Sequence, residues 1–514
     1  MTIDHVALLP AYAAAGTAVL AFLVEVALPG RRAAVLGATM LGTVATGVAA
    51  VWVHRGGGER VAFCVEPAGC SYQWDGRAAL IGILFATATL VVAALSVSVL
   101  RSGAVPAGEY CFLLACSLTG GVVLGASRDL ITLIIALETL TLPLFVLVGL
   151  RRRQTASAEA AVTFFVVSVV STAVTLLGAA LLYGATGTVH LDGLAAALSD
   201  RTGLVSVPLV GAAVVLVLVG LAFKVAAVPF HAWAPATYDG APLPVAAYLS
   251  TASKLGGVVA LLLVGVVGLG PWLDVSGPAF AVIAVLTMTV GNLVALRQRR
   301  MVRLLAWSSV AQAGYILAPL GAFATASGRG DIDLAVSAVL AYTVFYILLE
   351  LGAFGAVIAL RGAGDGGALD DYRGTARSHP WLTGAFVLAM AGLAGLPPGL
   401  AGLFAKVAVV RALLGGAAGW LAIVVALNAV VGLAYYVRAA LALFAREEPV
   451  AVASARTAEA RPPRGSARAP VATRAPVAAR VRVPLAVGAA LAVVTIAAIV
   501  VGLAPQLVLD AVRL

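Results

Sequence analysis

The chain has 514 residues, of which 62% are hydrophobic and 11% are charged, and its mean hydropathy is +1.06. This composition excludes a soluble globular domain and predicts a protein that crosses a membrane many times. The formal net charge is +10, and only three of the 33 basic residues are lysine. The charge is therefore carried mainly by arginine.

We expect an all-α polytopic membrane protein with about fourteen spanning helices, because about 20 apolar residues are needed to cross the hydrocarbon core as a helix. The expected spans lie near residues 6–27, 33–53, 78–100, 108–126, 129–150, 157–183, 205–230, 243–267, 274–296, 303–321, 332–360, 381–411, 417–444 and 483–508.

The loops between these spans differ in charge. If the N-terminus lies outside, the inner loops receive most of the arginines, including Arg31, Arg32 and the run at 151–153. The positive-inside rule then places both termini on the outer side of a plasma membrane. The high net charge thus reflects topology, and it gives no reason to expect a nucleic-acid partner.

Four cysteines fall in the first quarter of the chain. Cys64 and Cys70 lie in an outer loop, where they either form a disulfide or remain free thiols. Cys111 and Cys116 fall on the fourth span and are interpreted as packing residues. Since the sequence lacks clustered Cys and His ligands and a dinucleotide-binding glycine motif, it predicts no metal site and no cofactor-binding site in this chain.

The fifth expected span carries Glu138 near its middle. An ionised carboxylate at this depth is costly unless it is paired or lines a wet cavity. We therefore interpret Glu138 as a functional candidate. A helix-packing carboxyl group that a hydrogen bond keeps neutral is the alternative.

The three lysines all lie in apolar stretches of expected spans: Lys224 in the seventh, Lys254 in the eighth and Lys406 in the twelfth. Arginine keeps its proton in proteins, whereas a lysine removed from water can lose its charge. Codon bias explains the abundance of arginine, but it does not explain why lysine remains at these three positions. The pattern indicates charges that must be removable.

Two of the lysines lie beside prolines. Pro229 follows Lys224 by five residues, and Pro397 and Pro398 precede Lys406. Proline removes a backbone donor and interrupts a helix, and broken helices at membrane depth mark transport sites.

Because five spans separate the two breaks, the broken helices cross the membrane in opposite directions. This parity predicts two inverted-topology repeats, spans 4–8 and 9–13. We therefore divide the chain into N-terminal helices (1–107), a first repeat (108–267), a second repeat (268–445), a linker (446–481) and a last helix (482–514).

Two further ionisable residues are auxiliary candidates. His231 comes directly after the first break, where a proton relay and a satisfied polar residue are both reasonable interpretations. Glu350, on the eleventh span, is a buried partner for a lysine, a local proton site or a neutral hydrogen-bonded acid.

The linker at 446–481 is rich in Ala, Arg and Pro and has no apolar face. We expect it to be disordered on the inner side. An electrostatic tether to anionic lipid or to an acidic partner is the alternative.

Long motifs in this chain resemble a known family. They are PFHAWAPATYDGAPLPV at 229–245, the Ser-Lys pair at 253–254, ALRQRRMVRLLAWSSVAQAGY at 295–315 and GLPPGLAGLFAK at 395–406. On these residues, spans 4–13 resemble the antiporter-like membrane subunits of respiratory complex I (NADH:quinone oxidoreductase), and most closely its subunit N family. The same fold is shared with Mrp-type cation/proton antiporters.

The resemblance implies that Glu138, Lys224, Lys254 and Lys406 form a proton path. It also implies that quinone reduction in neighbouring subunits supplies the energy. NADH, FMN, iron–sulfur clusters and quinone would then be bound by partner subunits, and the partners of this chain would be other membrane-arm subunits within the lipid bilayer.

Five positions depart from the family pattern: Ala236, Leu243, Arg300, Val302 and Trp307. None is a proposed relay residue, but their replacement indicates a divergent member. Two alternative functions remain open at this point. One is a subunit of an Mrp-type Na⁺/H⁺ antiporter, and the other is a scaffold subunit that conducts no protons.

Overall fold

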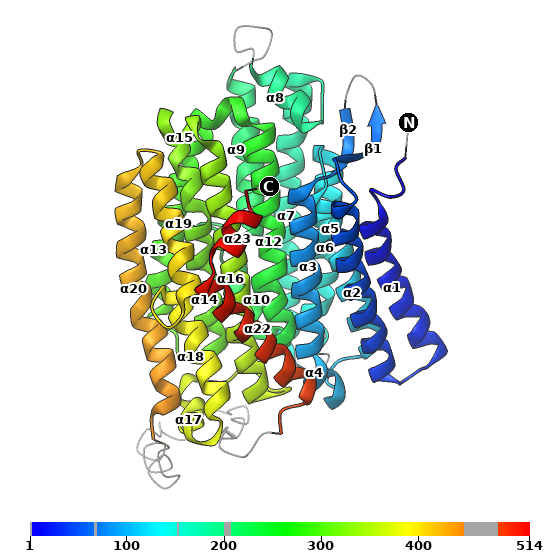
Figure 1. The fold of residues 1–514 in the computed structure, drawn as a ribbon, viewed down its shortest axis with the longest axis vertical. Helices are drawn as coiled ribbons and strands as arrows, with labels where there is room; N and C mark the ends of the chain where they lie inside the picture. The colour runs from blue at the N-terminus through cyan, green and yellow to red at the C-terminus, as the bar shows by residue number, and fades with distance from the viewer. Residues whose placement is uncertain (1–2, 66–68, 152–153, 200–206, 447–481, 514) are drawn as a thin grey trace, which may run out of the picture.

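The computed structural model describes residues 3–65, 69–151, 154–199, 207–446 and 482–513. Most of them form helices that run along one common direction in a tall bundle (Figure 1). The α-helices are α1 (Leu9–Ala27), α2 (Arg32–Arg55), α3 (Gly76–Leu95), α4 (Val97–Ser102), α5 (Ala107–Gly125), α6 (Leu130–Val148), α7 (Thr155–Thr186), α8 (Leu191–Ser199), α9 (Val207–Lys224), α10 (Trp233–Gly240), α11 (Leu243–Tyr248), α12 (Lys254–Leu262), α13 (Leu273–Ala295), α14 (Met301–Leu317), α15 (Ala326–Gly330), α16 (Ile332–Arg361), α17 (Thr375–Ser378), α18 (Pro380–Ala394), α19 (Leu400–Gly415), α20 (Gly419–Phe444), α22 (Leu485–Leu503) and α23 (Gln506–Ala511).

Eleven helices or joined helices in the described part of the chain are long and apolar enough to cross a membrane. The other expected spans correspond to shorter helices: α9, α14 and the pair formed by α18 and α19. The expectation of an all-α membrane protein with about fourteen spans is therefore confirmed. The short helices are those whose sequences contain or adjoin the proline breaks, or that continue as a 3₁₀ turn.

Aspartates begin several of the long helices. The side chain of Asp75 accepts a hydrogen bond from the backbone N–H of Ala78 at the start of α3, and Asp129 does the same for Thr132 at the start of α6. An N-cap carboxylate satisfies a backbone donor that the helix leaves free. These caps fix the depth at which each following helix begins, including α6, which carries Glu138.

Both proline-containing segments interrupt their helices. α9 ends at Lys224, and α10 begins only at Trp233, with Pro229 between them. In the second half, α18 ends at Ala394 and α19 begins at Leu400. Each break leaves a lysine within two turns of irregular backbone inside the bundle.

A two-stranded antiparallel hairpin, β1 (Arg60–Val65) and β2 (Gly69–Trp74), lies at the same end of the bundle as α8 and α15, whereas α4 and α17 lie at the opposite end (Figure 1). Cys64 and Cys70 face each other across the hairpin and form a disulfide. The sequence left this pairing open. Cys111 and Cys116 are free, and Cys111 is buried against its neighbours.

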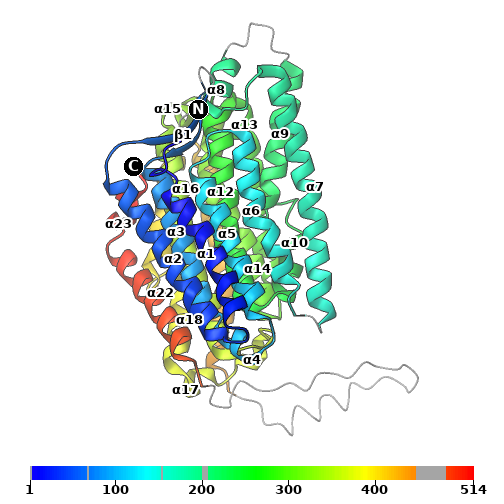
Figure 2. The ribbon, with the colours of Figure 1, turned by 90° about the vertical axis from the view of Figure 1, so that its right-hand side faces the viewer.

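The last long helix, α22, crosses the outside of the bundle and packs against α16, α19 and α3 (Figures 1 and 2). It thereby joins helices of the second proposed repeat to the N-terminal helix α3. The repeat boundaries themselves stay a prediction. Residues 447–481 of the linker expected at 446–481 lie outside the described residues, so its disorder also stays a prediction.

Candidate functional site

Glu138 and Lys224 form a buried ion pair between α6 and α9. The Lys224 Nζ atom donates to Glu138 Oε1 over 2.7 Å, and the two side chains are 4% and 20% exposed. Thr172 on α7 donates to the same carboxylate oxygen over 2.7 Å, and Ser168 accepts from Lys224 over 3.2 Å. The carboxylate thus has a hydroxyl donor besides the lysine.

A glycine on α12 permits the close approach of helices around Lys224. A Cβ atom at Gly257 would lie 2.9 Å from the carbonyl carbon of Lys224 and 2.8 Å from Val225 Cγ1. Such distances are shorter than packed side chains tolerate. The short backbone separation brings α12, which begins at Lys254, against the end of α9.

Lys254 is fully surrounded by protein but has no carboxylate in contact. Its Nζ atom donates to Ser309 Oγ over 2.6 Å and also to the Ser309 carbonyl oxygen. Ser309 shares a second hydrogen bond of 2.8 Å with the Tyr346 hydroxyl, which donates to the Ser250 carbonyl. The Lys254 amine also lies 5.5 Å from the centre of the Tyr346 ring, a distance suited to a cation–π contact.

Lys406 is held at the second break. Its Nζ atom donates to the carbonyl oxygen of Leu393, near the end of α18, over 2.7 Å. It also lies 5.4 Å from the ring centre of Tyr315. On its outer side, Lys406 lines a groove of about 670 Å³ together with residues of α16, α19 and α20, including Val410 and Val425.

A polar group lies between Lys254 and Lys406. Gln312, one turn after Ser309 on α14, donates to the same Leu393 carbonyl that accepts from Lys406. Gln312 also bonds the hydroxyls of Tyr342 and Tyr436. These residues were missed in the sequence, because Ser, Gln and Tyr in an apolar helix carry no signal of their own without the fold that brings them together.

The two auxiliary candidates differ in their surroundings. The ring of His231 lies 5.1 Å from that of Trp307, and its Nδ1 atom has no hydrogen-bond partner. The structure does not bring His231 into the hydrogen-bonded groups around the lysines. Glu350 on α16 is 0% exposed, and neither of its carboxyl oxygens has a hydrogen-bond partner.

Within the described ranges there is no cluster of His, Cys, Asp or Glu that could hold a metal ion. The groups suited to chemistry are instead amines, carboxyls and hydroxyls gathered around Lys224, Lys254 and Lys406. Groups of this kind exchange protons.

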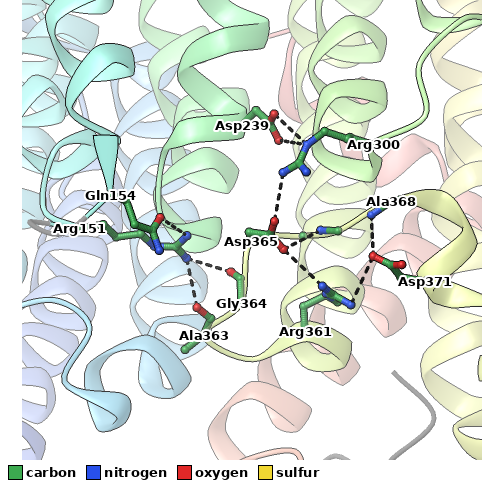
Figure 3. Close-up of polar contacts among 12 residues, drawn as sticks. Arg151, Gln154, Asp239, Arg300, Arg361, Ala363, Gly364, Asp365, Ala368 and Asp371 are labelled. Atoms are coloured by element: carbon green, nitrogen blue, oxygen red, sulfur yellow. Dashed lines mark hydrogen bonds and ion pairs between the residues drawn. The ribbon is translucent and has the colours of Figure 1, made fainter. Parts of the chain in front are cut away.

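A second polar network connects several helix ends and the loop after α16 (Figure 3). Arg300, at the start of α14, contacts both oxygens of Asp239 over 3.0 Å and also binds Asp365. Arg151 donates to the carbonyl oxygens of Ala363 and Gly364 in the same loop as Asp365. This network joins α10, α14 and the loop after α16, so the arginine that departs from the family pattern has a carboxylate partner.

The charge of Asp365 is stabilised in this network. Burial alone would raise its pKa, but the neighbouring guanidinium groups of Arg300 and Arg361 lower the pKa below its ordinary value. The carboxylate therefore stays ionised at neutral pH and keeps the loop attached to α14.

A family model described as NADH:quinone oxidoreductase/Mrp antiporter, TM, matches residues 127–432. NADH-quinone oxidoreductase subunit N of Salinispora tropica is 62% identical over 512 residues, which cover 99% of this chain and 98% of the relative. Subunit N 2 of Streptomyces griseus is 44% identical over 92% of this chain and 89% of the relative.

Two solved structures share the fold. A chain of respiratory complex I from Thermus thermophilus matches with a TM-score of 0.73 and 29% identity, covering 98% of this chain and 99% of that chain. A chain of the Mrp complex from Dietzia sp. matches with a TM-score of 0.79 and 22% identity, covering 99% and 97%. The second likeness concerns the fold alone. From the family model and the full-length relatives together, the chain belongs to the NADH-quinone oxidoreductase subunit N family of antiporter-like membrane proteins.

Proposed function

We propose that this chain moves protons across the plasma membrane as a membrane-arm subunit of an NADH:quinone oxidoreductase. The path runs through Glu138, Lys224, Lys254 and Lys406. The observation that carries the proposal is the buried ion pair between Glu138 and Lys224, which lies at the end of a broken helix. Redox chemistry takes place in other subunits, which bind NADH, FMN, iron–sulfur clusters and quinone. Both termini face the outer side.

The ion pair works as an electrostatic switch. Glu138 in contact with Lys224 favours the charged amine, whereas burial favours the neutral amine. When the carboxylate moves away or takes another partner, such as the nearby hydroxyl of Thr172 alone, Lys224 loses its stabilising charge. Its proton then passes toward Lys254 and on through the Ser309 and Gln312 region to Lys406.

The free-energy change at such a switch is of the size that pumping requires. Two opposite charges about 4 Å apart attract by about 4 kcal/mol at an effective dielectric constant of about 20. Moving one charge across about 100 mV requires about 2.3 kcal/mol. Breaking the pair therefore costs an energy comparable to moving a proton against a potential of somewhat under about 200 mV, and quinone reduction in other subunits supplies that energy.

The first test is Lys224→Arg in the intact complex. Arginine preserves the positive partner of Glu138 but keeps its proton, so we expect the complex to assemble and NADH-driven proton uptake by inverted membrane vesicles to fall at least about tenfold. NADH oxidation is measured in the same vesicles. A second variant, Lys224→Ala, removes the positive charge and leaves Glu138 without its lysine partner. Comparing the two variants separates the effect of losing the charge from the effect of losing proton release.

Wild-type proton uptake in the Lys224→Arg complex would contradict the proposed path. Proton movement that depends on a Na⁺ gradient, and that occurs without NADH and quinone, would instead favour the Mrp-type antiporter function. Wild-type uptake in both lysine variants would favour a scaffold subunit.

A further inference from the structure

Glu350 is a buried acid that is not among the four residues of the proposed path. It lies on α16 with 0% exposure, and both carboxyl oxygens lack a hydrogen-bond partner. A buried carboxylate without hydrogen bonds or a paired charge is strongly unfavourable. The carboxyl group must therefore be neutral, or its charge must be balanced by a neighbouring cation.

The titratable groups close enough to Glu350 to interact with its charge come from four elements. They are Lys254 on α12, Tyr238 on α10, Tyr346 on α16 itself and Tyr436 on α20. Of these four groups, Lys254 alone is a cation. Tyr346 lies one helical turn before Glu350 and shares the hydroxyl of Ser309 with the Lys254 amine.

Lys254 and Glu350 do not form a contact ion pair, unlike Lys224 and Glu138. The Lys254 amine donates to Ser309 instead. Two proton arrangements of the pair have the same total charge: a charged amine with a carboxylate, and a neutral amine with a carboxylic acid. Moving the proton from Lys254 Nζ to the Glu350 carboxylate converts the first into the second without adding net charge to the buried site.

We propose that Glu350 is an additional proton-carrying residue, which takes the proton released by Lys254 and passes it toward Lys406. This inference rests on the proposed function. The geometry supports the direction, because α16 packs against α18 and α19. These two helices supply the Leu393 carbonyl and the Lys406 amine. Each step moves one proton from a nitrogen or oxygen atom to the next, so no oxidant or other reactant is needed.

The test is Glu350→Gln in the intact complex. Glutamine keeps the size of the side chain but carries no exchangeable carboxyl proton. We expect assembly to be preserved, proton uptake per NADH to fall at least about tenfold, and a carboxylic-acid stretching band to disappear from the redox-induced infrared difference spectrum. The matched control is Glu159→Gln on the exposed side of α7, which should change neither quantity.

An unchanged uptake ratio and an unchanged infrared band in Glu350→Gln would overturn the inference. If the Glu350→Gln complex fails to assemble, the pH profile of proton uptake is measured in Glu350→Asp instead, because this variant keeps the acid on a shorter side chain. A shifted pH profile of proton uptake would then support the inference, and a profile identical to the wild type would contradict it.

A further variant distinguishes failure of the inference about Glu350 from failure of the proposed proton path. Lys254→Ala is measured beside Glu350→Gln in the same vesicles. Loss of uptake in the lysine variant alone would leave the proposed path standing without Glu350. Full uptake in both variants would contradict the path as well as the inference.

Discussion

The three lysines have chemically different partners. Lys224 contacts a carboxylate, Lys254 contacts a serine, and Lys406 contacts a backbone carbonyl and the face of a tyrosine ring. A carboxylate can change its charge or move, whereas a carbonyl has a fixed dipole. A movement of Glu138 therefore acts directly on Lys224, whereas neither Lys254 nor Lys406 donates a hydrogen bond to a carboxylate within the described residues.

Removing the Ser309 hydroxyl tests whether this single oxygen atom contributes to proton transfer at Lys254. This hydroxyl is the shared partner of Lys254 and Tyr346, and a hydrogen bond to a charged group contributes about 1.5–3 kcal/mol. In Ser309→Ala the backbone carbonyl still binds Lys254, so we expect a loss at the lower end of this range, which is a fall in proton uptake of about tenfold, with normal assembly. Stopped-flow measurement of vesicle acidification checks the rate; an unchanged rate would show that the hydroxyl is only structural.

The lysines and Glu138 could be selected from the sequence because a buried charge is costly wherever it lies. Their partners could not be selected. Thr172, Ser309 and Gln312 are ordinary helical residues, and their contacts join positions 34, 55 and 81 residues apart along the chain. Only the packing of the helices makes these hydroxyls and this amide part of the site.

At the scale of the helices, the site depends on how closely α12 approaches the end of α9. α9 ends at Lys224, five residues before Pro229, and Gly257 lets α12 lie close to this end because it has no side chain. The sequence predicted the position of each break from proline, whereas the contact between the two helices required the structure.

Gly257→Ala tests this contact. The added methyl group would overlap the backbone of Lys224, and overpacking of this kind costs about 1–3 kcal/mol. We expect a lower melting temperature of the complex and slower proton uptake, because α12 must move away from Lys224. The control is Gly211→Ala on α9, where a methyl group meets open space. Equal effects of the two variants would indicate a general helix effect instead.

Other features of the helices could not be predicted from the sequence. The alternation of apolar runs and arginine loops predicts where helices begin and end, but it contains no information on which ends meet. The contacts of Arg300 with Asp239 and Asp365 therefore appear only in the structure (Figure 3). In the sequence, Arg300 was only a departure from the family pattern. In the structure, it belongs to a network that joins residues of the two proposed repeats.

For the molecule as a whole, the fold class and the number of spans followed from composition, because hydrophobic length is a local property of the chain. Orientation is different. The prediction that both termini lie outside rests on the distribution of arginine between the loops. The chain ends lie toward the same end of the bundle as the hairpin of Cys64 and Cys70 (Figure 1).

Labelling of the hairpin cysteines tests the orientation. After mild reduction, Cys64 and Cys70 should react with a membrane-impermeant maleimide in intact cells, because the hairpin is predicted to lie outside. A Gly364→Cys variant in which Cys64 and Cys70 are replaced by serine should react only in inverted vesicles, because residue 364 lies at the opposite end. The control is a Cys64→Ser, Cys70→Ser double variant, which should remain unlabelled. Labelling in the reverse pattern would invert the proposed topology.

The scarcity of lysine also limits which side chains an amine-directed reagent can modify. Lys224 and Lys254 are buried, and Lys406 lies in the wall of a groove. An acylating reagent therefore has three side-chain targets in the 514 residues, and each belongs to the candidate path. An acyl group found on Lys224 or Lys254 would show that the reagent had entered the interior, so access to these two residues can be followed by mass spectrometry.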